Sequence, residues 1–318
     1  MPNDLESVLR AQPARSPYIG RLAPSPTGVM HLGIAQTSLL AWLDARAHEG
    51  ELRLRFEDVD TPRVVAGSAD DLLRDLEWLG LTWEGPVVFQ SDREARYAAA
   101  LDRLRSRGLV YPCTCSRREI REASAPHAGD EGPRYPGTCR KGAIAKPGRQ
   151  PSLRLRTRSV PVLHTDRRLG QIGHDVERTV GDFVLKRADG LWAYQMAVSV
   201  DDLDQGITCV VRGEDLAGST ARQLYLRHLL DADAPPLETL HAPLVRDEQG
   251  RRLAKRHGGA TAKPLRDRGT EAPVLIAAMA LGLGLIDRAD PVEASDLVPL
   301  WRDRLGSAAH GEEVAGTP

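Results

Sequence analysis

The chain has 318 residues, of which 41% are hydrophobic and 4% aromatic, so it can bury a mostly aliphatic core in two domains or in one domain with a large insertion. Its formal net charge of −1 gives no global argument for a nucleic-acid partner. The N-terminus lacks the apolar stretch of a signal peptide, and the longest apolar run (272–286) is interrupted and too short to span a bilayer. We therefore expect a cytoplasmic monomer that does not contact a membrane.

The first elements predict a ligand site. Residues 18–23 indicate a short strand, prolines stiffen the turn that follows, and apolar residues recur at helical spacing from Leu32. A helix N-terminus exposes unpaired N–H groups and the positive end of the helix dipole, which suits a phosphate. His31 lies at this point and can donate to a phosphate oxygen, while Gly33 allows a ligand to approach the backbone closely.

Strands and helices alternate through the first hundred residues, which predicts a parallel α/β sheet. The strand over 52–56 ends in a carboxylate-rich segment. Ser68 is a candidate N-cap for a helix over 69–79, and Ser91 is a candidate N-cap for a helix over 93–106.

The pattern changes after Val110. Residues 113–148 are rich in proline, glycine and charge and have poor periodicity, so this stretch needs a staple to be ordered. Between residues 117 and 168, 13 Lys or Arg residues stand against 5 Asp or Glu residues, a net charge of +8. This segment is either a solvated face or a surface that contacts RNA phosphates.

Three of the four cysteines cluster in this region, as Cys113-x-Cys115 and Cys139. Disulfides are unlikely in a cytoplasm, so the cluster predicts a tetrahedral structural metal site. His127 is the ordinary chemical choice for the fourth ligand, and Tyr135, which precedes Cys139 by four residues, is the alternative. Cys209 lies in a predicted strand and is interpreted as a small core residue.

Strand character returns at 207–211 and ends at Arg212, so Arg212 and Arg21 both lie at predicted carboxyl ends of strands, where ligands bind in open α/β sheets. Ser219 caps a predicted helix that ends at residue 230. A hairpin-like element over 241–255, with its turn at 247–250, then carries Lys255, a cation that can stabilise charge on phosphates.

The string Arg-Leu-Ala-Pro-Ser-Pro-Thr-Gly from Arg21, followed by His-Leu-Gly-Ile, resembles the signature of class I glutamyl-tRNA and glutaminyl-tRNA synthetases, in which R-x-A-P-S-P-T-G leads into the HIGH motif. Arg-Leu-Ala-Lys-Arg at 252–256 resembles the KMSKS loop in a degenerate form, and residues 194–215 are also family-like. The resemblance covers about residues 18–259. It implies a Rossmann-like parallel-sheet α/β catalytic domain with a zinc-containing α+β insertion.

The resemblance also implies roles for individual residues. The glutamate carboxylates would be clamped by two arginines, the ammonium group paired by Glu57, and a side-chain oxygen contacted by the Tyr194 hydroxyl. His31 and Lys255 would be the catalytic groups and, with Gly33, the ATP site, with Mg²⁺ on the phosphates. The implied glutamate-binding positions are Arg21, Leu22, Ala23, Pro24, Ser25, Glu57, Tyr194 and Arg212.

The implied reaction is attack of the glutamate α-carboxylate on the α-phosphorus of ATP, which gives glutamyl-adenylate. Only 62 residues follow Arg256, too few for the anticodon-binding region of full-length members of the family. The chain therefore resembles a truncated branch, in which glutamate activated without tRNA is transferred to the queuosine base at the wobble position of tRNA(Asp). The zinc ligands of that branch match Cys113, Cys115, Tyr135 and Cys139, which favours Tyr135 over His127.

Two alternatives remain open. One is a discrete glutamyl-tRNA synthetase that charges a tRNA 3′ end, and the other is a catalytically silent paralogue that binds zinc or RNA. The predicted organisation is a flexible N-terminus (1–17), a first catalytic half (18–109), a zinc-containing insertion that binds RNA (110–190), a second catalytic half with the KMSKS-like loop (191–259), a helical segment (260–306) and a disordered tail (307–318).

Overall fold

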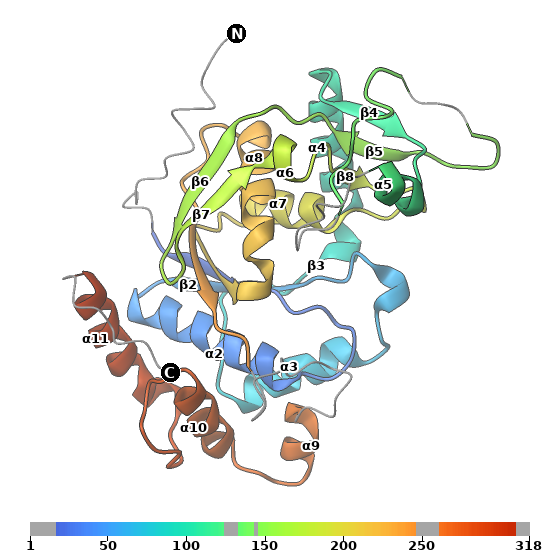
Figure 1. Cartoon of the computed structure of the whole chain (residues 1–318). Helices are drawn as coiled ribbons and strands as arrows, with labels where there is room; N and C mark the ends of the chain where they lie inside the picture. The colour runs from blue at the N-terminus through green and yellow to red at the C-terminus, as the bar shows by residue number, and fades with distance from the viewer. Residues whose placement is uncertain (1–16, 124–132, 143–145, 246–260, 310–318) are drawn as a thin grey trace. The chain divides into compact units, whose positions relative to one another are not determined.

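The computed structural model describes residues 17–123, 133–142, 146–245 and 261–309, which are coloured in Figure 1. The chain divides into two compact units, which we describe separately. The cysteine unit comprises Gln90–Gly206 and Leu216–Glu238. The sheet unit comprises Ser16–Phe89, Ile207–Asp215 and Thr239–Pro318.

The sheet unit is built on parallel strands. The strands β1 (Ile19–Leu22), β2 (Glu51–Phe56) and β3 (Val88–Phe89) pair in parallel in this order. The strand β9 (Cys209–Gly213) lies beside β1, where the Thr208 N–H donates to the Ile19 carbonyl (2.9 Å), and β10 (Glu238–Ala242) is the neighbour of β9. Parallel pairs need crossovers, and α2 (Leu32–Ala47) and α3 (Ser68–Trp78) connect the first strands. The predicted parallel α/β fold is confirmed.

Helix α2 lies at the centre of the core of this unit. Its residues 35–36 and 38–45 are buried, and α10 (Ala272–Gly282) and α11 (Leu297–Ala309) both pack against it, as Figure 1 shows. The short helix α9 (Ala262–Asp267) packs against α3. Helix α10 buries one face, including Ile276, and leaves Val274 exposed. Among the described residues, no helix has both the length and the apolar character that crossing a membrane requires.

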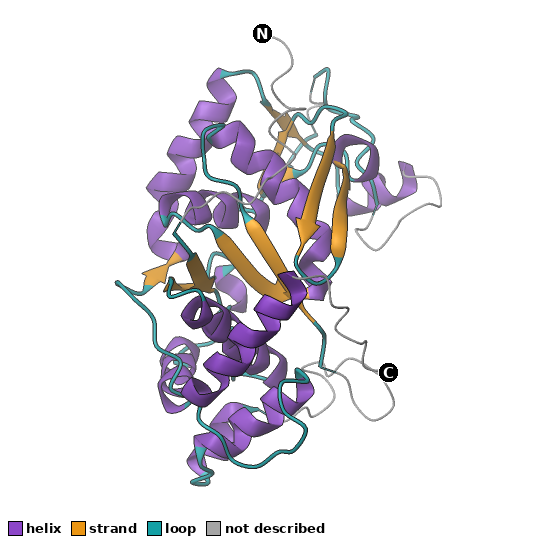
Figure 2. Cartoon of the chain, turned by 90° about the vertical axis from the view of Figure 1, so that its left-hand side faces the viewer, coloured by secondary structure: helices purple, strands orange, loops and turns teal. Residues whose placement is uncertain are grey.

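The cysteine unit combines a small antiparallel sheet, a hairpin and several helices. The sheet has the order β4-β5-β8, and the hairpin is formed by β6 and β7. Figure 2 shows the helices and strands of the whole chain in different colours. The bounds are β4 (Val110–Cys113), β5 (Ser152–Leu155), β6 (Pro161–Asp166), β7 (Gly170–Asp175), β8 (Val184–Lys186), α4 (Glu94–Ser106), α5 (Arg117–Ala123), α6 (Val176–Thr179), α7 (Tyr194–Asp204) and α8 (Thr220–Leu230).

Short 3₁₀ turns complete the described elements: η1 (Thr61–Arg63), η2 (Gln90–Arg93), η3 (Glu214–Ser219) and η5 (Ala294–Asp296). Asp201, a fully buried residue of α7, accepts hydrogen bonds from Gln90 Nε2 (2.8 Å), Arg93 Nε (2.6 Å) and the Tyr97 hydroxyl (2.9 Å). These bonds join η2 and α4 to α7, and the charge-assisted ones are stronger than neutral hydrogen bonds.

Two of the predicted N-caps are wrong. Helix α3 begins at Ser68 itself, with Gly67 at a φ of 76° as its N-cap, because the Ser68 hydroxyl is used by Gly28 far away in the chain. The helix predicted from residue 93 begins at Glu94, because Ser91 lies inside η2. Ser219 is the N-cap residue of α8, as predicted, but its side chain makes no capping bond. The predicted turn at 247–250 lies outside the described residues.

Candidate functional site

The loop that follows β1 is held in place by the segment that follows β2. The Glu57 N–H donates to the Pro24 carbonyl (3.0 Å). The Ser68 hydroxyl accepts from the Gly28 N–H (3.1 Å) and donates to the Gly28 carbonyl (2.6 Å). Gly28 has a φ of 129°, a conformation that L residues rarely adopt. The predicted glutamate-binding residues at the end of β1 and in this loop are therefore fixed to the sheet.

His31 is the N-cap residue of α2. Its Nδ1 accepts the Ile34 N–H at 3.3 Å, so the ring proton of a neutral imidazole lies on Nε2. The Nε2–H is thus the donor that His31 can present to a phosphate beside the helix N-terminus. A Cβ at Gly33 would lie 3.2 Å from His31 Nδ1. Gly33 therefore makes room for the imidazole, in addition to the role that the sequence predicted.

The two predicted substrate arginines lie on neighbouring strands of the sheet unit. Arg21 of β1 and Arg212 of β9 are 5% and 4% exposed, so neither is an ordinary surface arginine. Arg21 Nη1 donates to the Val211 carbonyl at 2.7 Å. Arg212 Nε donates to His241 Nε2 of β10 at 3.1 Å. Because Val211 directly precedes Arg212, the structure brings the two arginines to the same end of the sheet.

Glu57 directly follows β2 and lies at this same edge. Its Oε1 is 3.3 Å from Nη2 of Arg55, whose side chain is fully buried. The sequence did not single out Arg55. The four side chains Arg21, Arg55, Glu57 and Arg212 carry a net charge of +2 together, which favours a ligand with more than one carboxylate or phosphate group.

Two predicted site residues are not placed with the others. Tyr194 is the first residue of α7 and belongs to the cysteine unit. Lys255 lies outside the described residues, but the chain that follows it is described. The Ala262 N–H donates to the Met30 carbonyl (2.8 Å), and Thr261 forms a β-bridge with His31. The described chain therefore resumes, at Thr261, beside the N-terminus of α2.

The predicted metal ligands form one cluster in the cysteine unit. The Sγ atoms of Cys113, Cys115 and Cys139 all lie within 4.8 Å of one another, and the Sγ atoms of Cys115 and Cys139 are 3.6 Å apart. The Tyr135 hydroxyl oxygen is 3.3 Å from the Cys113 Sγ and 4.0 Å from the Cys115 Sγ, and it accepts the Cys139 N–H at 2.9 Å. A tetrahedron of 2.3 Å metal–sulfur bonds has edges of about 3.8 Å, so the three sulfur atoms lie close enough together for one ion to contact them all. His127 lies outside the described residues.

The surroundings of the cluster favour a cation. Burial and the neighbouring thiols raise the pKa of Cys115 to about 11, and burial raises the pKa of Tyr135 above its ordinary value. Several thiolates and a phenolate in one place need a compensating positive charge, which a divalent ion supplies. The cluster of Cys113, Cys115 and Cys139 can therefore hold a metal ion.

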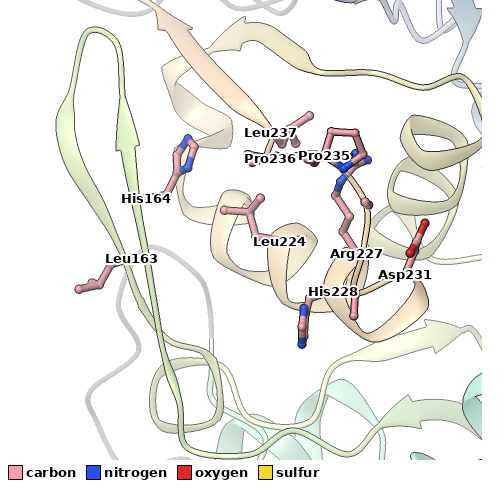
Figure 3. Close-up of a pocket in the computed structure, with 11 residues that line it drawn as sticks. Leu163, His164, Leu224, Arg227, His228, Asp231, Pro235, Pro236 and Leu237 are labelled. Carbon is pink, nitrogen blue, oxygen red and sulfur yellow. Dashed lines mark hydrogen bonds between the residues drawn. The ribbon is translucent and has the colours of Figure 1, made fainter. Parts of the chain in front are cut away.

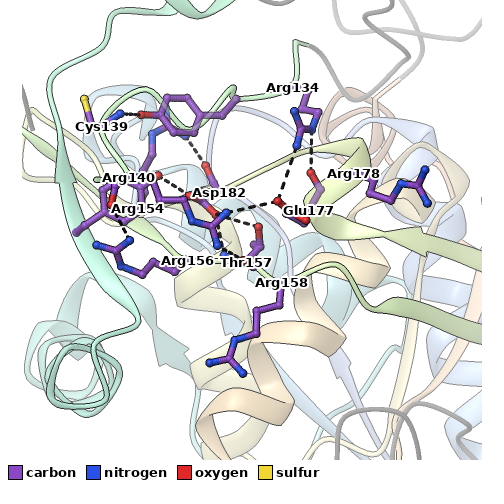
Figure 4. A network of polar contacts seen from close by, with 12 residues as sticks. Arg134, Cys139, Arg140, Arg154, Arg156, Thr157, Arg158, Glu177, Arg178 and Asp182 are labelled. Atoms are coloured by element: carbon purple, nitrogen blue, oxygen red, sulfur yellow. Dashed lines mark hydrogen bonds and ion pairs between the residues drawn. The ribbon is translucent and has the colours of Figure 1, made fainter. Parts of the chain in front are cut away.

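Asp182 anchors the segments around this cluster, as Figure 4 shows. It accepts from the Tyr111 hydroxyl (2.6 Å) and from the N–H (2.7 Å) and hydroxyl (2.9 Å) of Thr157. Arg140 Nη1 lies 3.5 Å from an Asp182 carboxylate oxygen and 3.4 Å from Glu177. The two carboxylates of Asp182 and Glu177 thus hold the segment that contains Arg140 in place.

Arg158 and Arg178 are two of the exposed arginines of the same region. In Figure 4, Arg158 and Arg178 point away from Glu177 and Asp182. Neither has an ion pair with a carboxylate in the part of the chain that the structure describes. Exposed guanidinium groups of this kind are suited to bind phosphates.

A small cavity of ≈ 80 Å³ lies elsewhere in the cysteine unit (Figure 3). His164 of β6, Leu224 and Arg227 of α8, and the 234–237 loop contribute to its lining. Ligand pockets commonly enclose about 300–1,000 Å³, so this cavity is too small for ATP. No sequence pattern predicted it.

A parallel sheet, a helix N-terminus suited to bind a phosphate and two buried arginines at strand ends are typical of a nucleotide-dependent enzyme that acts on a small anion. Residues 19–288 match the family model for the catalytic domain of class I tRNA synthetases (E and Q), and the chain belongs to this family.

Within this family, the chain is similar over most of its length to curated relatives that share one name. The glutamyl-Q tRNA(Asp) synthetase of Burkholderia cenocepacia (strain HI2424) is 50% identical over 275 residues, which cover 86% of this chain and 90% of that relative. The glutamyl-Q tRNA(Asp) synthetase of Geobacter sulfurreducens is 47% identical over 281 residues, 88% of both chains. The expected resemblance to the branch of the family that transfers glutamate to queuosine is confirmed by these relatives.

Among solved structures, a glutamate tRNA ligase from Elizabethkingia meningosepticum, crystallised with its amino acid, matches with a TM-score of 0.72 and 25% sequence identity. The match covers 89% of this chain but 64% of the ligase, so the chain spans slightly less than two thirds of that protein. The similarity supports the predicted fold class.

Proposed function

We propose that the chain activates L-glutamate with ATP to glutamyl-adenylate and pyrophosphate, without tRNA. It then transfers glutamate to the queuosine base at the wobble position of tRNA(Asp), with release of AMP. This proposal rests on sequence similarity to glutamyl-Q tRNA(Asp) synthetases, which are 47–50% identical to this chain over most of both chains. The buried arginine pair beside the His31 loop supports it, because glutamate offers two carboxylates to such a pair.

The first step needs no general base, since the α-carboxylate of glutamate is already a nucleophile. Catalysis is positioning and charge stabilisation. Arg21 and Arg212 hold the carboxylates, Glu57 pairs the ammonium group, and the Tyr194 hydroxyl contacts a side-chain oxygen. His31 Nε2–H and Lys255 would contact the phosphates, and Mg²⁺ bound with ATP would supply further positive charge there.

We infer that the metal held by the cysteine cluster is zinc and that its role is structural. Three sulfur ligands and a tetrahedral arrangement favour zinc, and Tyr135 supplies the fourth ligand. With all four positions filled by Cys113, Cys115, Tyr135 and Cys139, no position is left for a reacting water. The ion would fix the segment 133–142, which carries Arg134 and Arg140 of Figure 4.

The proposed substrates also bear on the cellular location of the chain and on its RNA-binding region. An enzyme that uses ATP and tRNA operates in the cytoplasm, and the chain would act there as a monomer. The region 110–190 would be the RNA-binding insertion, with Arg158 and Arg178 among its phosphate contacts.

The test has two stages. Metal-loaded protein is first assayed for ATP–pyrophosphate exchange in the absence of RNA, with glutamate, glutamine or aspartate. It is then given radiolabelled glutamate and tRNA(Asp) with queuosine, tRNA(Asp) without queuosine, or tRNA(Glu). We expect exchange with glutamate alone and labelling of the queuosine-bearing tRNA alone. Labelling of tRNA(Glu) at its 3′ end would instead identify a discrete glutamyl-tRNA synthetase, and folded protein without exchange would be a silent paralogue.

A further inference from the structure

We propose that His241 is a positioning residue, which sets the orientation of the Arg212 guanidinium so that it receives one carboxylate of the amino-acid substrate. This inference rests on the proposed function, because it assigns a task to His241 within the same glutamate site. The sequence singled out Arg212 and gave no role to His241.

The contact is buried and specific. His241 of β10 is fully buried, Arg212 of β9 is 4% exposed, and the two strands are neighbours in the sheet unit. Arg212 Nε donates to His241 Nε2 at 3.1 Å. An imidazole nitrogen accepts only when it carries no proton, so Nε2 is the acceptor nitrogen of the His241 ring.

The bond determines which edge of the guanidinium faces the substrate. A carboxylate can bind an arginine in bidentate fashion either across Nε and one Nη or across the two Nη groups. Because His241 occupies Nε of Arg212, the first mode is excluded. A substrate carboxylate on Arg212 would therefore be bound through Nη rather than through Nε.

Arg21 is oriented from the same strand. Its Nη1 donates to the carbonyl of Val211, the residue before Arg212, at 2.7 Å. Each arginine thus donates one N–H to a fixed acceptor of β9 or β10. The two side chains are therefore restricted to few rotamers before the substrate binds. Such preorganisation improves substrate binding because less ordering is required on binding.

The test compares two amide variants of the full chain in glutamate-dependent ATP–pyrophosphate exchange. In His241→Gln the longer side chain can place its amide oxygen near Arg212 Nε. In His241→Asn the side chain is one methylene shorter, so its oxygen does not reach Arg212 Nε. The matched control is Thr239→Val, which alters another buried polar residue of the same strand. KM for glutamate, KM for ATP, kcat and the melting temperature are measured for each.

We expect His241→Asn to raise the KM for glutamate about tenfold or more, with the KM for ATP changed less than twofold. His241→Gln should recover most of the glutamate affinity, and Thr239→Val should leave both KM values unchanged. His241→Leu adds a variant of similar volume without any acceptor, and it should resemble His241→Asn.

A merely structural histidine would give a different pattern. Unchanged KM for glutamate in His241→Asn, or equal increases in both KM values, overturns the inference. If Asn does not yield folded protein, a His241→Gln variant with wild-type melting temperature and a tenfold higher KM for glutamate also overturns it. A folded wild-type chain that performs no glutamate-dependent exchange refutes the proposed function itself, whereas normal wild-type exchange with unaffected variants refutes only the role of His241.

Discussion

Tyr111 and Tyr135 are two buried tyrosines of the cysteine unit with similar surroundings. A guanidinium lies over each ring, Arg156 at 4.6 Å from the Tyr111 centroid and Arg154 at 3.9 Å from the Tyr135 centroid. Their hydroxyl groups differ, because that of Tyr111 donates to Asp182 while that of Tyr135 lies among the cysteine sulfurs. The pair therefore provides a matched test of the fourth metal ligand.

We expect Tyr135→Phe to weaken zinc retention by about tenfold or more, because three protein ligands remain where four were present. Tyr111→Phe removes one buried hydrogen bond and should lower stability by about 1 kcal/mol while zinc affinity is unchanged. Competition with a chromogenic chelator measures both affinities. Equal zinc affinities in the two variants would show that Tyr135 is not a ligand and would return His127 as the candidate.

The residues of the candidate site divide into those that a motif marks and those that only tertiary structure reveals. Arg21 and Arg212 could be predicted because they lie in recognisable strings at strand ends. Arg55 could not be predicted in this way. It lies two residues after Arg53 in β2, so alternation alone places both arginines on the same face of the strand. Arg53 is 29% exposed and pairs with Glu51, whereas Arg55 is fully buried beside Glu57. This difference in exposure depends on which distant segments of the same chain pack against each arginine, and the local sequence pattern does not contain that information.

At the scale of elements, α2 is joined to α11 through a buried carboxylate. Asp44, near the carboxyl end of α2, is fully buried and accepts from the Tyr18 hydroxyl (2.5 Å) and from Trp301 Nε1 (3.0 Å). Burial raises the pKa of Tyr18 well above its ordinary value, so this hydroxyl remains a donor. The helix dipole disfavours a negative charge at this end, which makes the donors important.

Trp301→Phe should therefore lower the free energy of unfolding by about 1–3 kcal/mol, because a buried carboxylate loses a donor while the aromatic packing is largely kept. Urea denaturation measures the change. The matched control is Trp83→Phe, since Trp83 packs against the same core and has no hydrogen bond from its indole to any residue that the structure describes. If the two substitutions lower stability equally, the Asp44 contact does not stabilise the α2–α11 pair.

The contact between α3 and α9 gives stability a pH dependence. Asp75 of α3 is fully buried, and its Oδ1 lies 3.3 Å from Arg266 Nη1 of α9. Burial raises the pKa of Asp75 to about 6, and the opposing effect of Arg266 is smaller. The unfolded chain has an aspartate pKa of about 3.9, so the folded chain binds more protons between these values. Stability should then fall as the pH rises from about 4 to about 6.

Asp75→Asn removes this titration, so the unfolding free energy of the wild type relative to the variant should decrease between pH 4 and pH 6 and be constant above. Urea denaturation across this range measures it. Asp267→Asn is the control, because the hydrogen bond from Lys263 lowers the pKa of the exposed Asp267, and its contribution to stability is lost as the pH falls. A difference for Asp75→Asn that has this opposite sign, or none, would contradict the prediction.

Most elements of the sheet unit could be predicted because their patterns are local. The strand over 52–56 and the helix from Leu32 follow directly from alternation and helical periodicity. Contacts between distant segments could not be predicted. Ser68 has the sequence of an N-cap, but its hydroxyl binds Gly28, and the choice between these two partners depends on how β1 and β2 pair.

The whole molecule combines a net charge of −1 with a strongly basic segment, 117–168, of net charge +8. Part of this charge is neutralised internally, because Arg140 pairs with Glu177 and Asp182. Arg158 and Arg178 are exposed and lack such partners among the described carboxylates. Arg158 belongs to this segment and Arg178 follows it, and the exposed positive charge of both can attract an RNA backbone.

The double variant Arg158→Ala/Arg178→Ala should weaken RNA binding about tenfold at moderate salt and lower the slope of log affinity against log salt by about 1–2, as expected for one or two lost phosphate contacts. Exchange of pyrophosphate without RNA should be unchanged. The control Arg105→Ala/Arg118→Ala removes the same charge from the same unit, but these arginines are already paired with Asp102 (2.6 Å) and Glu122 (3.7 Å). Filter binding to queuosine-bearing tRNA(Asp) across a salt series measures both variants. Equal losses in the two would mean that the charge of the unit as a whole, rather than Arg158 and Arg178, attracts the RNA.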